Sequence, residues 1–240
     1  MSCWWSETKT LGEMRGYQGR ASFLEFMNYR RDVYSQNGED GIIEKILDLL
    51  NIDSGWACEF GAWDGVYLSN AYNLVQSRRF KALMIEGNPS KYQDLVKTAE
   101  ENDGKILPVN CYVGDGSNPE NSLDSILENN QVPRDFDLLS IDIDSHDYLV
   151  WKSLTNYKPK VVVIEINSGL DPKIDTEFNH LYELHSGAPY LSMLKLAEEK
   201  GYTLICHTGN MIFLRADLIE KLGYTPPEKI LDPFLNFWRS

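Results

Sequence analysis

Several acidic residues and one histidine lie close together at the end of one apolar run of the chain. Asp142, Asp144, His146 and Asp147 lie within six residues, directly after the run that ends at Ile141. Charged groups are costly beside a buried strand unless they serve a site or ligate an ion, so this cluster is a candidate for acid–base chemistry or ligation. The alternative is that some of these acids only cap helices, and Asp147 is well placed to begin one.

Polar residues also follow other apolar runs. Glu165 and Asn167 come after the run 161–164, and strand alternation places both on one side. Glu86 ends the run 81–86, where a carboxylate can accept hydrogen bonds from both hydroxyls of a ribose; the alternative is a solvated acid at a strand end. Asn110 follows the next run, and Asp115 lies between two glycines shortly after it, a pattern suited to an adenine edge.

A glycine-containing turn follows the first of these runs, with the sequence Glu59-Phe60-Gly61-Ala62-Trp63-Asp64-Gly65. Such a turn can bring backbone amides close to a ligand. It is not the GxGxxG fingerprint, which argues against a pyrophosphate cradle for a nicotinamide dinucleotide.

The elements that must position these residues alternate between short apolar runs and helix-like stretches, the pattern of an α/β protein with a parallel sheet. We predict strands over 56–60, 81–86, 106–109, 136–141, 161–166, 202–207 and 211–215. We predict helices over 40–50, 89–101 and 190–200, and one that starts at Asn121. Only Thr208-Gly209-Asn210 separates the last two strands, so they must form an antiparallel hairpin at the end of a mostly parallel sheet.

The composition is that of an ordinary globular chain. Its 240 residues are 42% hydrophobic, and 23 basic against 36 acidic residues give a formal charge of −13. An acidic chain repels phosphate backbones, so we expect no nucleic-acid partner. No apolar stretch approaches the roughly 18 residues of a membrane span. The four scattered cysteines form no CxxC pair, and residues 1–5 lack the features of a secretory signal, so we expect a cytoplasmic protein.

The motifs together resemble a known family. The Glu59-Phe60-Gly61-Ala62 turn, the stretch Ser122-Leu123-Asp124-Ser125-Ile126-Leu127, the segment 137–147 and the strands ending at Asn167 and Arg215 resemble, in this order, the FkbM-type branch of the class I S-adenosylmethionine-dependent methyltransferases. The resemblance covers about residues 34–218. It implies a Rossmann-like sheet of seven strands whose last strand is antiparallel, in agreement with the predicted hairpin.

The resemblance also implies how S-adenosyl-L-methionine would bind. Glu59, Gly61 and Asp64 would line its methionine part, Glu86 would hold the ribose, and Asn110 or Asp115 would face the adenine. Gly87 and Asp142 would also belong to the cofactor-binding residues. Gln36, in the lead-in segment 34–40, would contact the cofactor carboxylate. Two departures stand out: the first turn has Trp63-Asp64 in place of a further glycine, and Asp144-Ser145 replaces the usual Glu-Gly.

Methyl transfer to a hydroxyl oxygen needs a base or a Lewis acid, because a sugar hydroxyl is a weak acid. His146 and Asp144 are the candidate bases, with Asp142 beside them. A second resemblance, to catechol O-methyltransferase and the macrolide-sugar O-methyltransferases, implies Mg²⁺ (or Mn²⁺) held by Asp142, Glu165 and Asn167. The stretch 168–189 follows the fifth strand, and its polar and aromatic residues suit a sugar-like acceptor or another polyhydroxylated small molecule.

We therefore predict an S-adenosylmethionine-dependent O-methyltransferase acting on a small polar acceptor, a sugar or a nucleotide-sugar. A non-catalytic binding or assembly protein of this fold and a nucleotide-dependent oxidoreductase are the alternatives. The predicted organisation is an N-terminal extension (1–33), a methyltransferase domain (34–220) and an aromatic C-terminal tail (221–240). We expect such a tail to pack on the core or on a second subunit of a homodimer, and the alternative is a functional lid.

Overall fold

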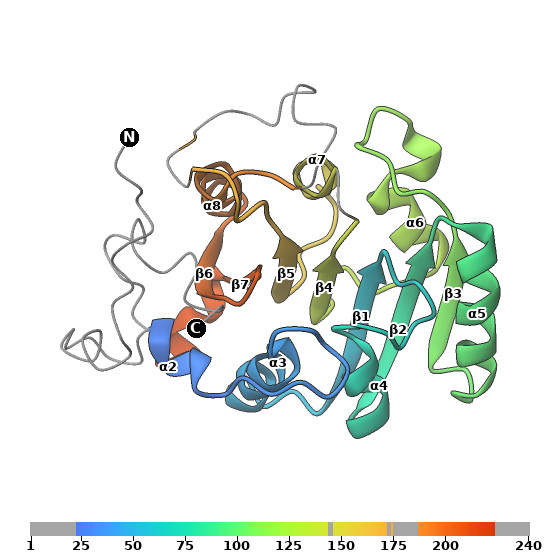
Figure 1. Ribbon diagram of the computed structural model, residues 1–240, viewed down its shortest axis with the longest axis horizontal. Coiled ribbons are helices and arrows are strands. Elements are labelled where there is room, and N and C mark those ends of the chain that lie inside the picture. Colours follow the sequence, from blue (N-terminus) through green and yellow to red (C-terminus); the bar gives the residue numbers. More distant parts are fainter. Residues whose placement is uncertain (1–22, 144–145, 172–173, 175–186, 224–240) are drawn as a thin grey trace.

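One sheet of seven strands organises the protein. The computed structural model describes residues 23–143, 146–171, 174 and 187–223. The strand order is β3-β2-β1-β4-β5-β7-β6 (Figure 1). The strands are β1 (Ser54–Phe60), β2 (Arg79–Glu86), β3 (Ile106–Asn110), β4 (Leu138–Ile141), β5 (Val161–Glu165), β6 (Tyr202–His207) and β7 (Asn210–Arg215). β7 runs antiparallel to both of its neighbours and the remaining pairs are parallel, which confirms the predicted α/β fold with a reversed last strand.

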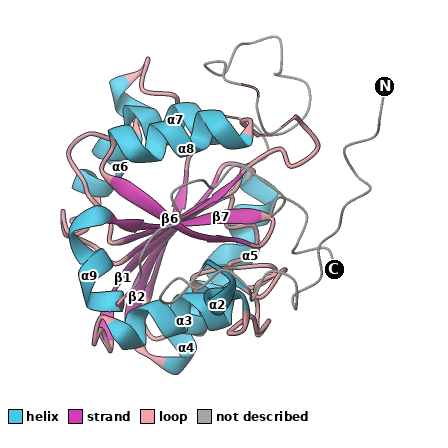
Figure 2. Cartoon of the chain, turned by 90° about the vertical axis from the view of Figure 1, so that its left-hand side faces the viewer, coloured by secondary structure: helices cyan, strands magenta, loops and turns pink. Residues whose placement is uncertain are grey.

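Helices cover both faces of the sheet. The α-helices of the described residues are α2 (Phe23–Met27), α3 (Glu39–Leu49), α4 (Tyr72–Ser77), α5 (Pro89–Glu100), α6 (Leu123–Asn129), α7 (Asp147–Ser153), α8 (Tyr190–Glu199) and α9 (Ile219–Leu222). α6, α7 and α8 lie on one face, α3 and α4 lie on the other, and the strands between them fan out with the twist of the sheet (Figure 2). α5 packs along β2 and β3. Within the described part of the chain, no helix is long and apolar enough to cross a membrane.

The central strands are buried on both faces, which explains their continuous apolar runs. Every residue from Val161 to Ile164 is at most 1% exposed. On the α7 side of the sheet, the ring of Trp151 lies 5.3 Å from the ring of Phe213 and 5.5 Å from that of Tyr202. This core holds the strand ends in place.

The helix starts follow local capping. As predicted, α5 begins with Pro89 behind an Asn88 cap, whose side chain accepts a hydrogen bond from the Ser90 amide at 2.9 Å. The predicted start of the next helix at Asn121 is wrong by one residue. Ser122 caps α6, because Asn121 still belongs to the short 3-10 turn Pro119–Asn121 that precedes it. The short α4 was not predicted, because six residues give little periodicity.

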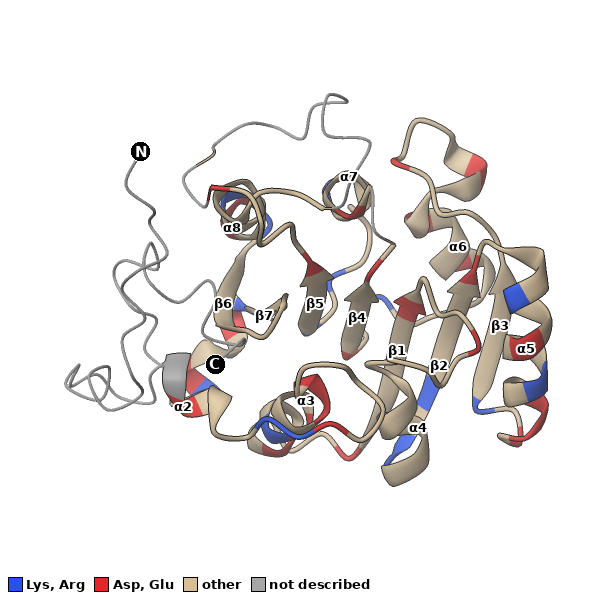
Figure 3. Cartoon of the chain, viewed as in Figure 1, with Lys and Arg blue, Asp and Glu red and all other residues tan. Residues whose placement is uncertain are grey.

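The strand register brings the carboxyl ends of the central strands to one edge. Phe60 of β1 pairs with Ile85 of β2 and with Ile141 of β4, which in turn pairs with Ile164 of β5. The residues that follow leave the sheet together at this carboxyl edge. Figure 3 shows acidic positions at several of these strand tips and basic positions at the opposite edge.

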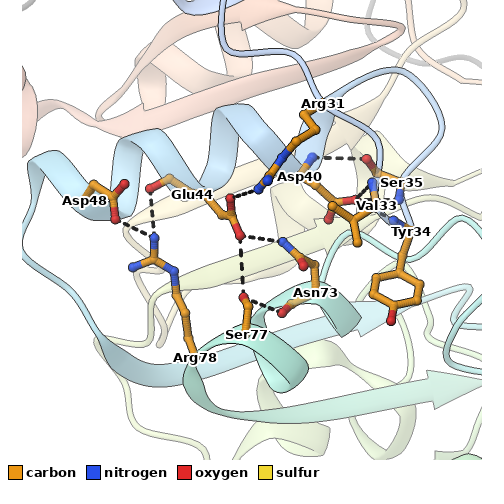
Figure 4. A network of polar contacts seen from close by, with 10 residues as sticks. All are labelled: Arg31, Val33, Tyr34, Ser35, Asp40, Glu44, Asp48, Asn73, Ser77 and Arg78. Atoms are coloured by element: carbon orange, nitrogen blue, oxygen red, sulfur yellow. Dashed lines mark hydrogen bonds and ion pairs between the residues drawn. The ribbon is translucent and has the colours of Figure 1, made fainter.

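Polar contacts connect α3 to α4, which lie on the same face of the sheet (Figure 4). Arg78, whose side chain is 13% exposed, donates to the carbonyl oxygens of Ile52 at 3.0 Å and Glu44 at 3.3 Å, and it pairs with Asp48. Asn73 donates to the Glu44 carboxylate at 2.8 Å. These contacts join the helix that precedes β1 to the helix that follows it.

The predicted ends of the chain lie mostly outside the described residues. Residues 1–22 of the predicted extension and 224–240 of the predicted tail are not among them. Of the extension, Phe26 and Met27 on α2 are buried in the core.

Candidate functional site

A cavity of about 460 Å³ opens at the carboxyl edge, between the ends of β1, β2, β3 and β4. Small-molecule sites typically measure about 300–1,000 Å³, so it is large enough for a cofactor. Among the predicted site residues, Gly61, Glu86, Gly87, Asp142 and His146 line it. The other lining residues are Phe60, Trp63, Ile85, Cys111, Tyr112, Val113 and Ile143.

Glu86 stands at the tip of β2 with both carboxylate oxygens held by backbone amides. Oε2 accepts from the Trp63 amide at 2.8 Å, and Oε1 accepts from the Asn88 amide at 2.6 Å. Each carboxylate oxygen has two acceptor directions, so one on each oxygen remains for a further donor such as a ribose hydroxyl. Asn110 does not line the cavity; its side-chain amide donates to the Glu86 carbonyl oxygen at 2.7 Å and so supports this strand end.

Gly61 allows the turn after β1 to pack directly on the end of β4. Its φ is +76°, a conformation that residues with a side chain rarely adopt. A β-carbon at this position would lie 1.9 Å from the carbonyl oxygen of Asp142. The cavity wall formed by Gly61 and Asp142 therefore requires glycine.

Glu59 lies beneath this turn and does not line the cavity. Its side chain is buried and accepts hydrogen bonds from the Ser69 hydroxyl and from the Asn70 amide at 2.8 Å. Burial raises the pKa of the Glu59 carboxyl, although these hydrogen bonds act in the opposite direction. In this structure Glu59 organises the loop behind the cavity.

Asp64 and Gln36 also lie outside the cavity lining. The Asp64 carboxylate accepts from the amides of Val66 at 2.9 Å and Tyr67 at 2.7 Å, which closes the loop after β1. Gln36 is exposed in the lead-in segment. The buried Asp40 carboxylate shapes that segment by accepting from three consecutive backbone amides, those of residues 33–35, at 2.7–2.9 Å.

The loop after β4 carries His146 to the cavity. His146 is half-buried immediately before α7, and Asp147 is fully buried with its side chain accepting from the Ile143 amide at 2.9 Å. Asp147 is the first residue of α7, where the sequence predicted a helix start, and its carboxylate supports the loop that precedes the helix. Hydrogen bonds from Ser117 lower the pKa of Asp115, and the nearby His146 acts in the same direction, so the two loops approach each other. Asp144 lies outside the described residues.

Glu165 and Asn167 follow β5, the strand next to β4. Glu165 comes directly after Ile164, the partner of Ile141, but neither Glu165 nor Asn167 lines the cavity. The side-chain oxygen of Asn167 accepts from the Gly169 amide at 2.9 Å. Across the residues described here, no three His, Cys, Asp or Glu side chains gather in a way that could hold a metal ion. The set of Asp142, Glu165 and Asn167 stays a prediction.

Two exposed aromatic residues at the cavity, Tyr112 and Trp63, are not among the predicted site residues. Tyr112 is 70% exposed, and its ring lies so close over Gly87 that an added β-carbon would come within 2.4 Å of it. Trp63 is 45% exposed. The sequence feature that could have identified Trp63 is its position in the turn after the first strand, where the FkbM-type family has a glycine.

A second cavity, of about 500 Å³, lies at the opposite edge of the sheet. Its charged lining residues pair mainly with one another: Arg78 contacts both Asp48 and Asp53. These pairs belong to the contacts between α3 and α4, so we assign the functional site to the carboxyl edge. Its lining residues are Glu44, Asp48, Asp53, Ser77, Arg78 and Arg79.

A seven-stranded sheet of this order, with a cavity at its carboxyl edge, is the arrangement of the class I S-adenosylmethionine-dependent methyltransferases. Residues 117–204 match the family model described as the methyltransferase FkbM domain. This match agrees with the resemblance of the sequence motifs to the FkbM-type branch and supports a methyltransferase. No curated protein matches the sequence.

Several solved methyltransferase structures resemble the chain. A putative tRNA (m1A22) methyltransferase of Streptococcus pneumoniae is 11% identical, with 81% of this chain and 80% of that chain covered and a TM-score of 0.45. TrmK of M. capricolum, in complex with S-adenosyl-homocysteine, is 12% identical, with 78% and 71% covered and a TM-score of 0.42. The CurJ carbon methyltransferase is 9% identical, with 80% and 57% covered and a TM-score of 0.49.

Proposed function

We propose that the protein transfers the methyl group of S-adenosylmethionine to a hydroxyl oxygen of a small polar acceptor, which is a sugar or a nucleotide-sugar. We propose that this reaction takes place in the cytoplasm. The observation that carries the proposal is the shared cavity: Glu86 stands on one side of it, and Asp142 and His146 stand on another. It thus combines an acceptor for ribose hydroxyls with groups that can take up a proton.

The residues of the cavity fit the cofactor. Glu86 would accept from the two ribose hydroxyls through its remaining acceptor directions. Gly61, which has no room for a side chain, would let the backbone of the turn approach the methionine part. When bound, S-adenosylmethionine supplies an electrophilic methyl group to an in-line displacement, for which positioning is the main contribution of the protein.

His146 is the base that we propose. A hydroxyl oxygen becomes a better nucleophile as its proton leaves, and the unprotonated ring nitrogen of His146 can accept this proton. Asp142 shares the cavity wall with His146 and would orient the acceptor hydroxyl. Asp144 is the second candidate base from the sequence.

Mg²⁺ or Mn²⁺ would offer a different route, in which the metal ion lowers the pKa of the acceptor hydroxyl. It is the second candidate here, because only Asp142 of the three candidate ligands lines the cavity. The test is turnover in excess EDTA. Full activity in EDTA would support proton removal by a side chain of the protein. If activity is lost in EDTA and added Mg²⁺ restores it, the reaction uses the metal ion.

The test of the proposed reaction is an acceptor screen. Purified protein is incubated with S-adenosylmethionine and a panel of sugars, nucleotide-sugars and small hydroxylated metabolites, and S-adenosylhomocysteine is measured by mass spectrometry. We expect formation that depends on one acceptor and a product that carries an O-methyl group. Methylation on nitrogen or carbon would refute O-methyl transfer.

Two variants test the roles of the side chains in that reaction. His146→Gln should lower turnover at least 100-fold, since a positioned base typically contributes about 10²–10⁴-fold to the rate. Asp142→Asn should lower turnover by about 100-fold, since a misplaced acceptor costs about this much. Calorimetry with S-adenosylhomocysteine is the control, and the affinity of both variants should stay within a few fold of the wild type. Unchanged turnover of His146→Gln would remove His146 as the base and leave Asp144.

A further inference from the structure

Trp63 has a backbone conformation that is costly for its side chain. Its φ is +52°, in the left-handed region, where a bulky residue is an outlier. Burial in the core does not explain this conformation, because the residue is 45% exposed. Strain of this kind persists where the surroundings hold it in place, and it is frequent at ligand sites.

The backbone and the ring of Trp63 are both held at the cofactor cavity. The amide donates to Glu86 Oε2 at 2.8 Å, so the residue is tied to the proposed ribose acceptor. The ring lines the cavity, and Lys91 Nζ from the first turn of α5 lies 4.1 Å from the ring centroid. The ring of Tyr67 lies 5.8 Å from that of Trp63. Neighbours from two segments thus fix the indole at the mouth of the cavity.

We propose that the Trp63 indole is a wall of the cofactor site that contacts the nucleoside part of S-adenosylmethionine, an inference that rests on the proposed function. One face of the ring is covered by Lys91. The rest of the apolar ring is available beside Glu86, where a ribose bound to this carboxylate would lie. Burying this ring surface against the nucleoside favours binding and offsets the backbone strain.

The proposal makes opposite predictions for stability and for binding. Trp63→Gly relieves the strain, because glycine adopts positive φ readily, so its melting temperature should equal or exceed that of the wild type. The same change removes the ring, so the dissociation constant for S-adenosylhomocysteine should rise at least tenfold in calorimetry. Trp63→Ala keeps a β-carbon and should lose affinity to the same extent. This variant distinguishes the effect of losing the ring from the effect of a more flexible backbone in Trp63→Gly.

Tryptophan fluorescence provides a second readout that does not depend on Trp63→Gly. Titration with S-adenosylhomocysteine should change the emission of the wild type, and Trp63→Phe should lose most of this change while its affinity stays within a few fold. Trp56→Phe is the matched control. Trp56 also has a lysine over its ring, Lys81 at 5.6 Å, but it lies in the first half of β1, away from the cavity. This variant should keep the change.

The outcomes separate the two proposals. If the wild type fails to bind S-adenosylhomocysteine, the proposed function fails together with this inference. If the wild type binds and Trp63→Gly and Trp63→Ala bind as tightly, the wall is refuted and the proposed function stands. Should Trp63→Gly not fold, an unchanged emission response in Trp63→Phe refutes the wall by itself.

Discussion

Replacement of Glu86 by alanine tests the cofactor site most directly. The carboxylate lies at the tip of β2, lines the cavity and already accepts from the amides of Trp63 and Asn88. Those two contacts orient it, and one acceptor direction on each oxygen is left for the proposed contacts with the ribose hydroxyls. Alanine removes both ribose hydrogen bonds at once and leaves the apolar walls of the cavity in place.

The expected loss follows from the number of hydrogen bonds and their charge. A hydrogen bond to an ionised group contributes about 1.5–3 kcal/mol, so two would contribute about 3–6 kcal/mol if nothing replaced them. Water enters the half-exposed position of the missing carboxylate and recovers part of this. We expect a net loss of about 2–4 kcal/mol, which corresponds to roughly 30- to 700-fold in the dissociation constant.

The assay is isothermal titration calorimetry with S-adenosylhomocysteine at constant ionic strength. Glu100→Ala is the matched control, because it makes the same change in charge and size at an exposed position near the end of α5. A thermal melt of each variant checks that the cavity is still folded, since Glu86 also links two backbone segments. Glu86→Gln keeps one acceptor oxygen and should lose less affinity than Glu86→Ala.

Glu86 is not the ribose acceptor if Glu86→Ala binds S-adenosylhomocysteine within threefold of the wild type while its melting curve is unchanged. Glu86 would then only brace the turns after β1 and β2. A loss of similar size in Glu100→Ala would instead mean that net charge, rather than a specific contact, governs affinity.

Further predictions concern the fold and the charge of the protein. Gly61→Ala should lower the free energy of unfolding by about 3 kcal/mol in urea denaturation, because it combines a strained positive φ with a clash against the Asp142 carbonyl oxygen. Burial raises the pKa of Glu59 above its ordinary value of 4.5, so the stability gained from its protonated form is present below pH 4.5 and is lost as the pH rises through the folded-state pKa. Glu59→Gln, which stays neutral, should therefore become more stable relative to the wild type between pH 4.5 and 8 in urea midpoints; a constant or opposite difference would contradict this. With a formal charge of −13, the protein should give no mobility shift with DNA or RNA at physiological salt, and submicromolar binding would overturn the expectation.

The sequence alone determined the seven strands, the longer helices and the order of the candidate site residues along the chain. Buried parallel strands need apolar residues on both faces, so runs such as 161–164 were recognisable without tertiary information. The two-residue connection between β6 and β7 leaves no room for a crossover helix, so the reversed last strand could also be predicted. Because parallel strands end at one edge of a sheet, Glu86 and Asp142 could be assigned to one site.

Only the tertiary structure decided which of the candidate residues face the cavity. Glu59 and Glu86 are both acids at the ends of strands, but Phe60 pairs with Ile85, so Glu86 extends one residue beyond the end of β1 while Glu59 remains inside the sheet. The loop after β1 then covers Glu59 with the Ser69 hydroxyl and the Asn70 amide. Strand register depends on contacts between residues more than twenty positions apart in the chain, and side-chain alternation within one strand does not specify it.

The surroundings of Trp63 were likewise decided by the tertiary structure. The sequence shows only that an aromatic residue occupies a turn position where the resembling family has glycine. Its left-handed backbone, its amide contact with Glu86 and the lysine over its ring come from three segments that meet only in the folded chain. Turn conformations depend on such long-range contacts as well as on local propensity, and the direction of a side chain in a turn is therefore settled by the packing around it.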